Sequence, residues 1–200
     1  MSVSHLTGLF RNPKAEWARI RDQDYSVADC LLRHTLLFAL IPALSGFIGT
    51  TQTGWRVGAG EPIRLTLSSA LPISIMYYLA MIAAVFSVGW MIRWMGETYG
   101  ADQPLSRCLA LASYTATPLF IISIMQVYPL LWLNLVAGLP ALGYTAYFFY
   151  SGVPVMMDIS EDRGFLFASA VLAFGLVALV AMLAVTVLLW SAGFDLAYTR

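Results

Sequence analysis

The chain has 200 residues, of which 60% are hydrophobic and 11% are charged, with 11 basic and 11 acidic side chains. Soluble domains are typically about 45–50% apolar and about 25% charged. This balance excludes a disordered chain, a basic nucleic-acid-binding module and an ordinary soluble enzyme. The mean hydropathy of +0.75 favours an integral membrane protein.

The charged residues are confined to short segments of the chain. Residues 35–55, 65–92, 108–157 and 164–194 contain none. A helix in a soluble protein needs a polar face toward water, whereas a charge at the centre of a membrane span costs about 2.5–3.5 kcal/mol. The sequence therefore predicts that these four stretches lie in a bilayer.

The 50-residue stretch at 108–157 has room for two helices, since one span needs about 20 residues. We expect the break near Pro129, because proline can begin a helix but disrupts its interior. The predicted fold is therefore all-α: an integral membrane bundle of five transmembrane helices preceded by a short amphipathic interfacial helix. The bundle forms one domain at 31–190, and the predicted spans are residues 31–49, 65–92, 108–126, 129–151 and 165–190.

Basic residues predict the orientation of the bundle. With a cytoplasmic N-terminus, eight basic side chains lie inside, and Arg56, Arg64 and Arg200 lie outside. This asymmetry satisfies the positive-inside rule. An odd number of spans then places the short tail at 191–200 on the outer, periplasmic side.

The cytoplasmic segment 1–30 contains the predicted amphipathic helix, at residues 12–21. Asn12 is a suitable N-cap, and Pro13 suits the first helical position. The helix either anchors the bundle at the membrane surface or docks a cytoplasmic partner. The candidate partner-binding residues are Trp17, Arg19, Ile20 and Arg21.

Prolines and polar side chains lie inside the predicted spans. Each interior proline frees a carbonyl four residues back, which a hydroxyl group, a water molecule or a neighbouring helix must satisfy. Such residues are typical of a compact kinked bundle, and also of broken helices around a cavity near the midplane. The residues singled out are Pro72, Tyr78, Tyr114, Thr117, Pro118, Asn134, Pro140, Tyr144 and Tyr147.

Few side chains in the predicted spans suit catalysis. The spans carry no acidic residue, and both histidines lie at or outside the inner edge of the membrane, so neither aspartyl nor serine–histidine catalysis is expected. We therefore expect no enzyme, no catalytic residue and no cofactor. Cys30, His34 and Cys108 are weak candidate metal ligands, because they lack a paired spacing motif.

Several motifs follow one another in an order that resembles one family. They are NPKAEW at 12–17, LIPAL at 40–44, FIG at 47–49, YTATPLF at 114–120, YP at 128–129, GYTAY at 143–147 and YSGVP at 150–154. Together they resemble bacterial members of the Yip (Ypt/Rab-interacting protein) domain family over nearly the whole chain, and they single out Gly152 and Pro154. The resemblance implies five spans, a cytoplasmic N-terminus, an inner-membrane location and no settled reaction. Eukaryotic relatives are associated with Rab-type GTPases and vesicle traffic, without known catalytic activity.

Two functions of different classes follow from the sequence. The first is a non-enzymatic inner-membrane protein that organises the membrane or binds protein partners. Its candidate partners are the lipid bilayer, a second copy of the chain, and a membrane or cytoplasmic protein, but no nucleic acid. The alternative is a lipid-handling or small-molecule permeation protein that uses the proline-kinked second, third and fourth spans. Under that alternative, the path is lined by Tyr78, Tyr114, Thr117, Asn134 and Tyr144.

Overall fold

The computed structural model describes residues 3–23, 26–30, 34–55, 62–191 and 198–199. Residues 31–33 of the first predicted span and most of the predicted tail lie outside these ranges. The described helices are α1 (Val3–Arg11), α2 (Pro13–Arg21), α3 (Val27–Cys30), α4 (Leu36–Ile48), α5 (Leu67–Tyr99), α6 (Leu105–Ile122), α7 (Leu131–Met157) and α8 (Glu161–Ser191). A π-helical turn, η2 (Gly49–Thr53), extends α4, and a 3-10 turn, η3 (Ser123–Val127), extends α6.

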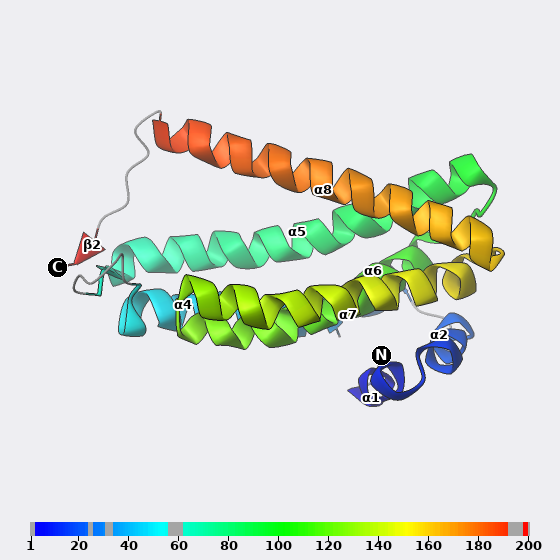
Figure 1. The fold of residues 1–200 in the computed structure, drawn as a ribbon, viewed down its shortest axis with the longest axis horizontal. Coiled ribbons are helices and arrows are strands. Elements are labelled where there is room, and N and C mark those ends of the chain that lie inside the picture. The colour runs from blue at the N-terminus through cyan, green and yellow to red at the C-terminus, as the bar shows by residue number, and fades with distance from the viewer. Residues whose placement is uncertain (1–2, 24–25, 31–33, 56–61, 192–197, 200) are drawn as a thin grey trace.

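The long helices α4 to α8 run along the long axis of the molecule (Figure 1), and the predicted all-α class is confirmed. Within the described residues, three helical segments are long and apolar enough to cross a membrane: Leu36–Thr53, Leu67–Tyr99 and Leu105–Val127. The helices α7 and α8 have 27 and 31 residues, which also exceeds the length of one span. The count of five spans stays a prediction.

Local sequence explains where several helices begin and end. Thr66 caps α5 by accepting a hydrogen bond from the Ser69 amide at 3.3 Å. The same helix ends at Gly100, whose φ of 74° lies in the left-handed region that glycine adopts without strain. Between α6 and α7, η3 and Pro129 occupy the position of the predicted break.

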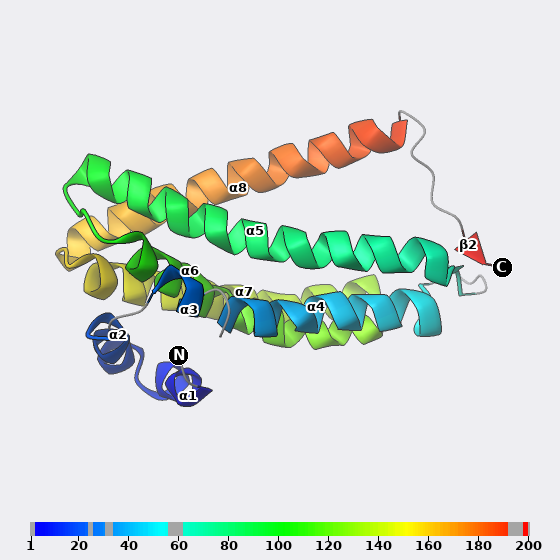
Figure 2. The same ribbon diagram turned by 180° about the vertical axis from the view of Figure 1, so that it is seen from behind.

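A short antiparallel sheet was not expected from the sequence. Strand β1 (Arg64–Leu65) pairs with β2 (Tyr198–Thr199), so that the end of the chain returns to the connection between α4 and α5. Trp55 and Ile63 form a further bridge in this connection. The sheet lies at one end of the long axis, and α1 and α2 lie toward the other (Figures 1 and 2).

The helix α6 is the centre of the packed core. Residues 108–115 of α6 are all buried, and α4, α5 and α7 surround this helix. Small residues allow the close approach: a Cβ on Gly89 of α5 would come within 2.6 Å of the Leu109 side chain. Close approach also occurs at the other end of the bundle, where a Cβ on Gly49 of η2 would overlap the Gln126 carbonyl of η3.

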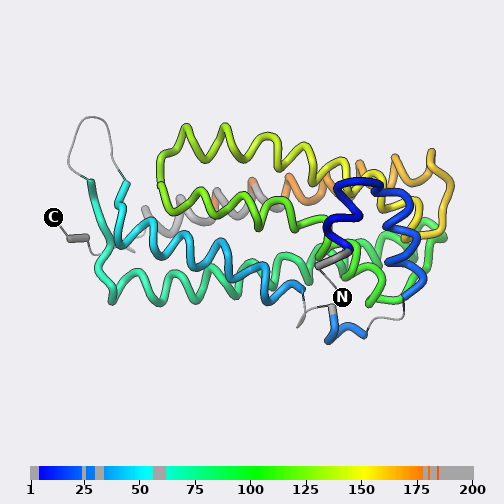
Figure 3. Tube along the Cα trace, turned by 90° about the horizontal axis from the view of Figure 1, so that it is seen from below, coloured from blue at the N-terminus to red at the C-terminus, as the bar shows by residue number. Residues whose placement is uncertain are grey.

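The first two helices form an N-terminal hairpin, residues 3–21, that packs against α7 (Figures 1 and 3). Asn12 caps α2 through a hydrogen bond from the Ala15 amide, which confirms the predicted helix start. Trp17 is fully buried, and its Nε1 donates to the Ser151 hydroxyl of α7 at 3.3 Å. The apolar face of α2 is therefore covered by the protein itself.

This packing changes the interpretation of the partner-binding candidates. Trp17 and Ile20 are 0% and 1% exposed, so neither side chain is available at the surface of a single chain. The sequence shows which residues share a face of α2, but the surface that covers this face is formed by α1 and by α7, more than 120 residues away. Of the four candidates, Arg19 and Arg21 keep exposed or partly exposed side chains.

Gly152 on α7 provides a test of the docked hairpin. A Cβ at this position would lie 2.7 Å from both Trp17 and Leu111, so Gly152→Val should destabilise the folded state by about 1–3 kcal/mol through overpacking. Gly143→Val is the matched control on α7, because a Cβ there meets nothing within 4 Å. The readouts are the thermal midpoint in detergent and the rate of trypsin cleavage within residues 3–21. Equal midpoints and cleavage rates for the two variants would contradict the docked arrangement.

Candidate functional site

An apolar cavity of about 750 Å³ lies within the bundle. Helices α5, α6, α7 and α8 all contribute lining residues, and ligand-binding pockets in proteins have volumes of about 300–1,000 Å³. None of its lining residues is charged. Representative lining residues are Met81, Val88, Leu119, Phe120, Leu142 and Leu172.

The cavity is long in the direction of the helices. Tyr77 and Met91 both line it from α5, and they are separated by about four turns, or about 21 Å along the axis. The hydrocarbon core of a bilayer is about 30 Å thick. The cavity therefore has the length of an extended hydrocarbon chain rather than that of a small polar solute.

The two amide side chains that line the cavity lie at one of its ends. Gln126 of η3 donates from Nε2 to the Tyr77 hydroxyl at 3.3 Å. Asn134 lines the same end, and its Nδ2 donates to the carbonyls of Tyr128 and Leu130 at 2.9 and 3.0 Å. At the opposite end the lining includes apolar residues such as Met91 and Phe149. An amphiphile would therefore have its polar group beside Gln126.

Two hydroxyl groups line the cavity toward its other end, since Thr145 is one turn from Phe149 along α7 and Thr115 is one turn from Ala112 along α6. Thr115 of α6 and Thr145 of α7 have buried Oγ1 atoms with no hydrogen-bond partner among the described residues. Thr115 is only 8% exposed. A buried polar atom without a partner costs about 1–3 kcal/mol, which a polar atom of a bound molecule would offset. Both hydroxyls thus support occupation of this space.

The residues expected to line a path do not meet around this cavity. Of Tyr78, Tyr114, Thr117, Asn134 and Tyr144, only Asn134 lines it. Tyr144 faces the N-terminal hairpin, where its ring lies 5.4 Å from that of Phe10. Tyr78 points toward α4 and donates its hydroxyl to the Leu36 carbonyl at 3.2 Å. The helix α8, in which the sequence singled out no site residue, also contributes part of the wall.

Tyr114 and Thr117 belong instead to a buried polar joint between α4 and α6. His34 Nε2 and Thr117 Oγ1 are 2.9 Å apart, and the His34 ring lies 4.5 Å from the Tyr114 ring. Next to them, the hydroxyls of Thr35 and Ser113 are 2.8 Å apart. The hydrogen bonds of this joint hold the start of α4 against α6.

Of the other residues that the sequence singled out, some lie at the surface of the bundle and others in its core. Pro72, Pro140 and Tyr147 are exposed. Pro118 is buried in α6, and Pro154 packs against Gly164 at the start of α8. Together with Gly152, which contacts Trp17, Pro154 has a packing role at the hairpin end of the bundle.

The three metal-ligand candidates are not brought together in the described part of the chain. Thr117, the partner of His34, is nine residues from Cys108 on α6, about 14 Å along the axis. The side chain of Cys30 lies outside the described residues. No group of three or more histidine, cysteine or acidic side chains with metal-binding geometry occurs among the side chains that are described.

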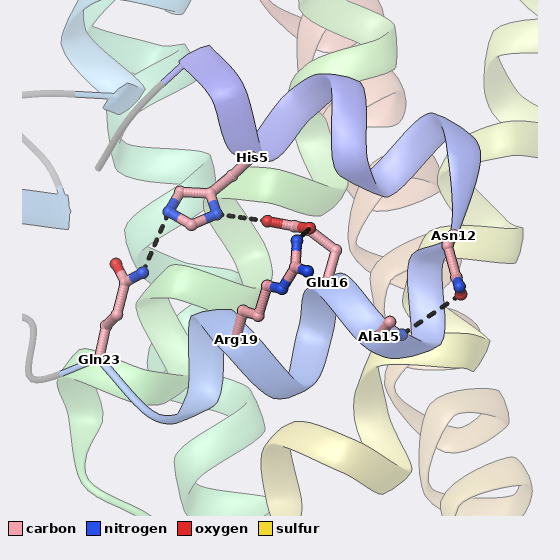
Figure 4. A network of polar contacts seen from close by, with 6 residues as sticks. All are labelled: His5, Asn12, Ala15, Glu16, Arg19 and Gln23. Carbon is pink, nitrogen blue, oxygen red and sulfur yellow. Dashed lines mark hydrogen bonds and ion pairs between the residues drawn. The ribbon is translucent and has the colours of Figure 1, made fainter.

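A polar network inside the N-terminal hairpin was missed by the sequence analysis (Figure 4). Glu16 is 5% exposed, its Oε1 lies 2.5 Å from His5 Nδ1, and its Oε2 accepts from Arg19 Nη1 at 3.1 Å. Gln23 Nε2 lies 3.2 Å from the other ring nitrogen of His5. The available signal was that Glu16 precedes Ile20 by four residues and so shares its buried face.

A second ion pair joins the hairpin to the bundle. Lys14 Nζ donates to Glu161 Oε1 at 2.7 Å, between α2 and the start of α8. This hydrogen bond and the opposite charges raise the pKa of Lys14 and lower the pKa of Glu161. Both side chains are exposed, so the pair orients the hairpin more than it stabilises it.

Comparison with known proteins relates this architecture to one family. The model of the Yip1 domain matches residues 7–182. Inner membrane protein YohC of Escherichia coli K12 is 38% identical over 194 residues, which cover 97% of this chain and 100% of that protein. The protein of the same name from Escherichia coli O6:H1 strain CFT073 has the same identity and coverage. No solved structure matches the chain.

Glu16→Gln tests the buried network. The substitution keeps the shape of the side chain but removes the charge that faces His5 and Arg19, so we expect the hairpin to be destabilised by about 1–3 kcal/mol. Hydrogen exchange of residues 3–21 measures the effect. The control is Glu97→Gln, which breaks an exposed pair with Arg93 and should cost about 0.5 kcal/mol or less. Unchanged exchange in Glu16→Gln would show that the network does not hold the hairpin.

Proposed function

Since this chain belongs to the Yip1 domain family of membrane proteins, we propose that it is a non-enzymatic, lipid-binding protein of the bacterial inner membrane. The observation that carries the proposal is the apolar cavity between α5, α6, α7 and α8, which has no charged lining residue among those described and has its two amide side chains at one end. The inner-membrane location follows the name of the 38% identical relative. The bound molecule would be a membrane amphiphile with at least one hydrocarbon chain.

The lining favours a lipid over a solute in transit. A permeation path for polar solutes needs polar groups along its length and access from both sides of the membrane. Here the two amide side chains lie near one end, the other polar lining groups are hydroxyls, and no described lining residue is charged. Binding an acyl chain between its helices would let the protein organise nearby lipid, which connects the two functions inferred from the sequence.

The proposal includes five membrane spans with a cytoplasmic N-terminus. Support comes from the three helical segments that are long and apolar enough to cross a membrane, and from the lengths of α7 and α8. It also comes from the excess of basic residues on the hairpin side, and from the positions of α1 and β2 toward opposite ends of the long axis. The cavity then has Gln126 toward the periplasmic leaflet and Met91 toward the cytoplasmic side.

Binding to a second copy of the chain or to another protein is the second candidate. It is favoured by exposed small residues four apart on α5, Ala83 and Ser87, a spacing that allows another helix to approach closely in a membrane. Ser87→Leu should then reduce chemical crosslinking between copies, or to the partner, in the membrane. A protein that stays monomeric and uncrosslinked before any substitution would leave lipid binding as the proposed function.

Filling the cavity tests lipid binding directly. Gly138 lines the cavity and a Cβ there meets nothing within 4 Å, so Gly138→Phe should occupy the space without disrupting α7. We expect a loss of at least half of the lipid that copurifies with the protein, measured by native mass spectrometry of the full chain in detergent. Gly143→Phe is the matched control, because Gly143 has equal free space but does not line the cavity. Equal lipid retention in both variants would contradict the proposal.

Reporters fused to the two ends test the predicted topology. An N-terminal reporter should be active only in the cytoplasm and a C-terminal reporter only in the periplasm, because the number of spans is odd. Reporters that locate both ends in one compartment would exclude five spans.

A further inference from the structure

A second pocket, of about 430 Å³, lies in the groove between α1 and α2. It is separate from the lipid cavity, since the two share no lining residue. The residues used below are His5, Arg11, Asn12, Glu16 and Arg19, all of which line it. We refer to this space as the hairpin pocket.

The negative charge of Glu16 at the floor of the hairpin pocket is already paired with neighbouring side chains. Glu16 is the single carboxylate among its lining residues, and both of its oxygens already face partners, His5 and Arg19 (Figure 4). Gly8 makes room for this carboxylate, because a Cβ at that position would overlap Glu16 Oε2. A cation in the pocket would therefore have to compete with an existing ion pair.

Several N–H donors at the rim of the hairpin pocket make no hydrogen bond within the described part of the chain. Arg11 is exposed, and its guanidinium has no hydrogen-bond or ion-pair partner among the described residues. The side chain of Arg19 is 72% exposed and is bonded to Glu16 through Nη1, which leaves other N–H groups free. The Asn12 amide carbonyl caps α2, and its amide nitrogen has no partner in the described part of the chain. These donors suit an acceptor with several oxygens.

The hairpin lies at the level expected for lipid headgroups. Its Trp17 contacts Gly152, which precedes the end of α7 by only five residues, about 8 Å. Lys14 reaches Glu161 at the start of α8, close to Asp158 in the connection between α7 and α8. The headgroup layer on each side of a bilayer is about 5–8 Å thick. Residues 3–21 also carry four basic and one acidic side chain.

We propose that the hairpin pocket binds the phosphate group of an anionic phospholipid of the cytoplasmic leaflet, held between Arg11 and Arg19. Guanidinium groups bind phosphate oxygens through paired N–H donors, which a single ammonium does not reproduce. A lipid at this position would be held next to α7 by a site that does not depend on the cavity. The same donors would recognise free phosphate, which shares this chemistry.

The test compares retention of phosphatidylglycerol and phosphatidylcholine on the purified full-length protein by native mass spectrometry. Arg11→Gln should lower phosphatidylglycerol retention about fivefold, which is the effect of one basic residue worth about 1 kcal/mol at an anionic membrane surface. Arg11→Gln combined with Arg19→Gln should lower it more than tenfold. Phosphatidylcholine retention should not change, because its headgroup has no net charge.

Lys14→Gln is the matched control, since Lys14 belongs to the same hairpin but does not line the pocket. Phosphatidylglycerol retention that is unchanged in the arginine variants, or reduced equally in Lys14→Gln, would overturn the proposal.

Titration of lipid-free protein with inorganic phosphate distinguishes a lipid phosphate from free phosphate as the ligand. Arginine-dependent binding of inorganic phosphate without a preference for phosphatidylglycerol would overturn the lipid assignment. Because Gly138 lies outside the hairpin pocket, Arg11→Gln should cause the same fold reduction in phosphatidylglycerol retention in a Gly138→Phe background, which separates failure of this site from failure of the cavity.

Discussion

The architecture depends on the burial of α6 among α4, α5 and α7. A helix surrounded in this way cannot direct polar side chains to water, so each must find a partner inside the bundle. Thr117 and Ser113 find theirs in His34 and Thr35, which holds α4 in place. Thr115, on the opposite side of α6, has no partner among the described residues and faces the cavity. The helix α6 thus contributes both to the buried polar contacts with α4 and to the wall of the cavity.

The cavity exists because the helices pack unevenly along their length. Gly152 accommodates Trp17 toward the hairpin, and Gly49 of η2 lies close against Gln126 of η3 at the other end. Farther along α7 and α8, a Cβ added at Gly138 or Gly175 would meet nothing within 4 Å, and both glycines line the cavity instead. In water such an apolar space would be costly, but in a bilayer lipid chains are available to fill it. Uneven packing is therefore compatible with a stable membrane protein.

The N-terminal hairpin shows how a surface element becomes part of the bundle. Trp17 inserts against α7, Lys14 reaches α8, and the buried Glu16 ties α2 to His5 of α1. The polar face of the hairpin remains outside, with Arg11 at its rim. The two proposed lipid sites consequently lie at different depths, one within the hydrocarbon region and one among the headgroups. Each can be altered without the other.

The amino-acid sequence was sufficient to predict membrane residence, the helical class, the start of α2 at Asn12 and the break near Pro129. Each depends on local chemistry or on charge exclusion from hydrocarbon, which need no knowledge of neighbours in space. The candidate site was predicted far less well. Tyr144 and Asn134 are both polar residues of α7, yet only Asn134 lines the cavity, because the rotation of α7 is set by contacts with α6, α8 and the hairpin. The burial of Glu16 and Trp17 likewise depends on other helices, because α1 covers Glu16 and α7 covers Trp17. Which face of each helix meets protein, lipid or empty space is a property of long-range packing, and the tertiary structure alone decided it.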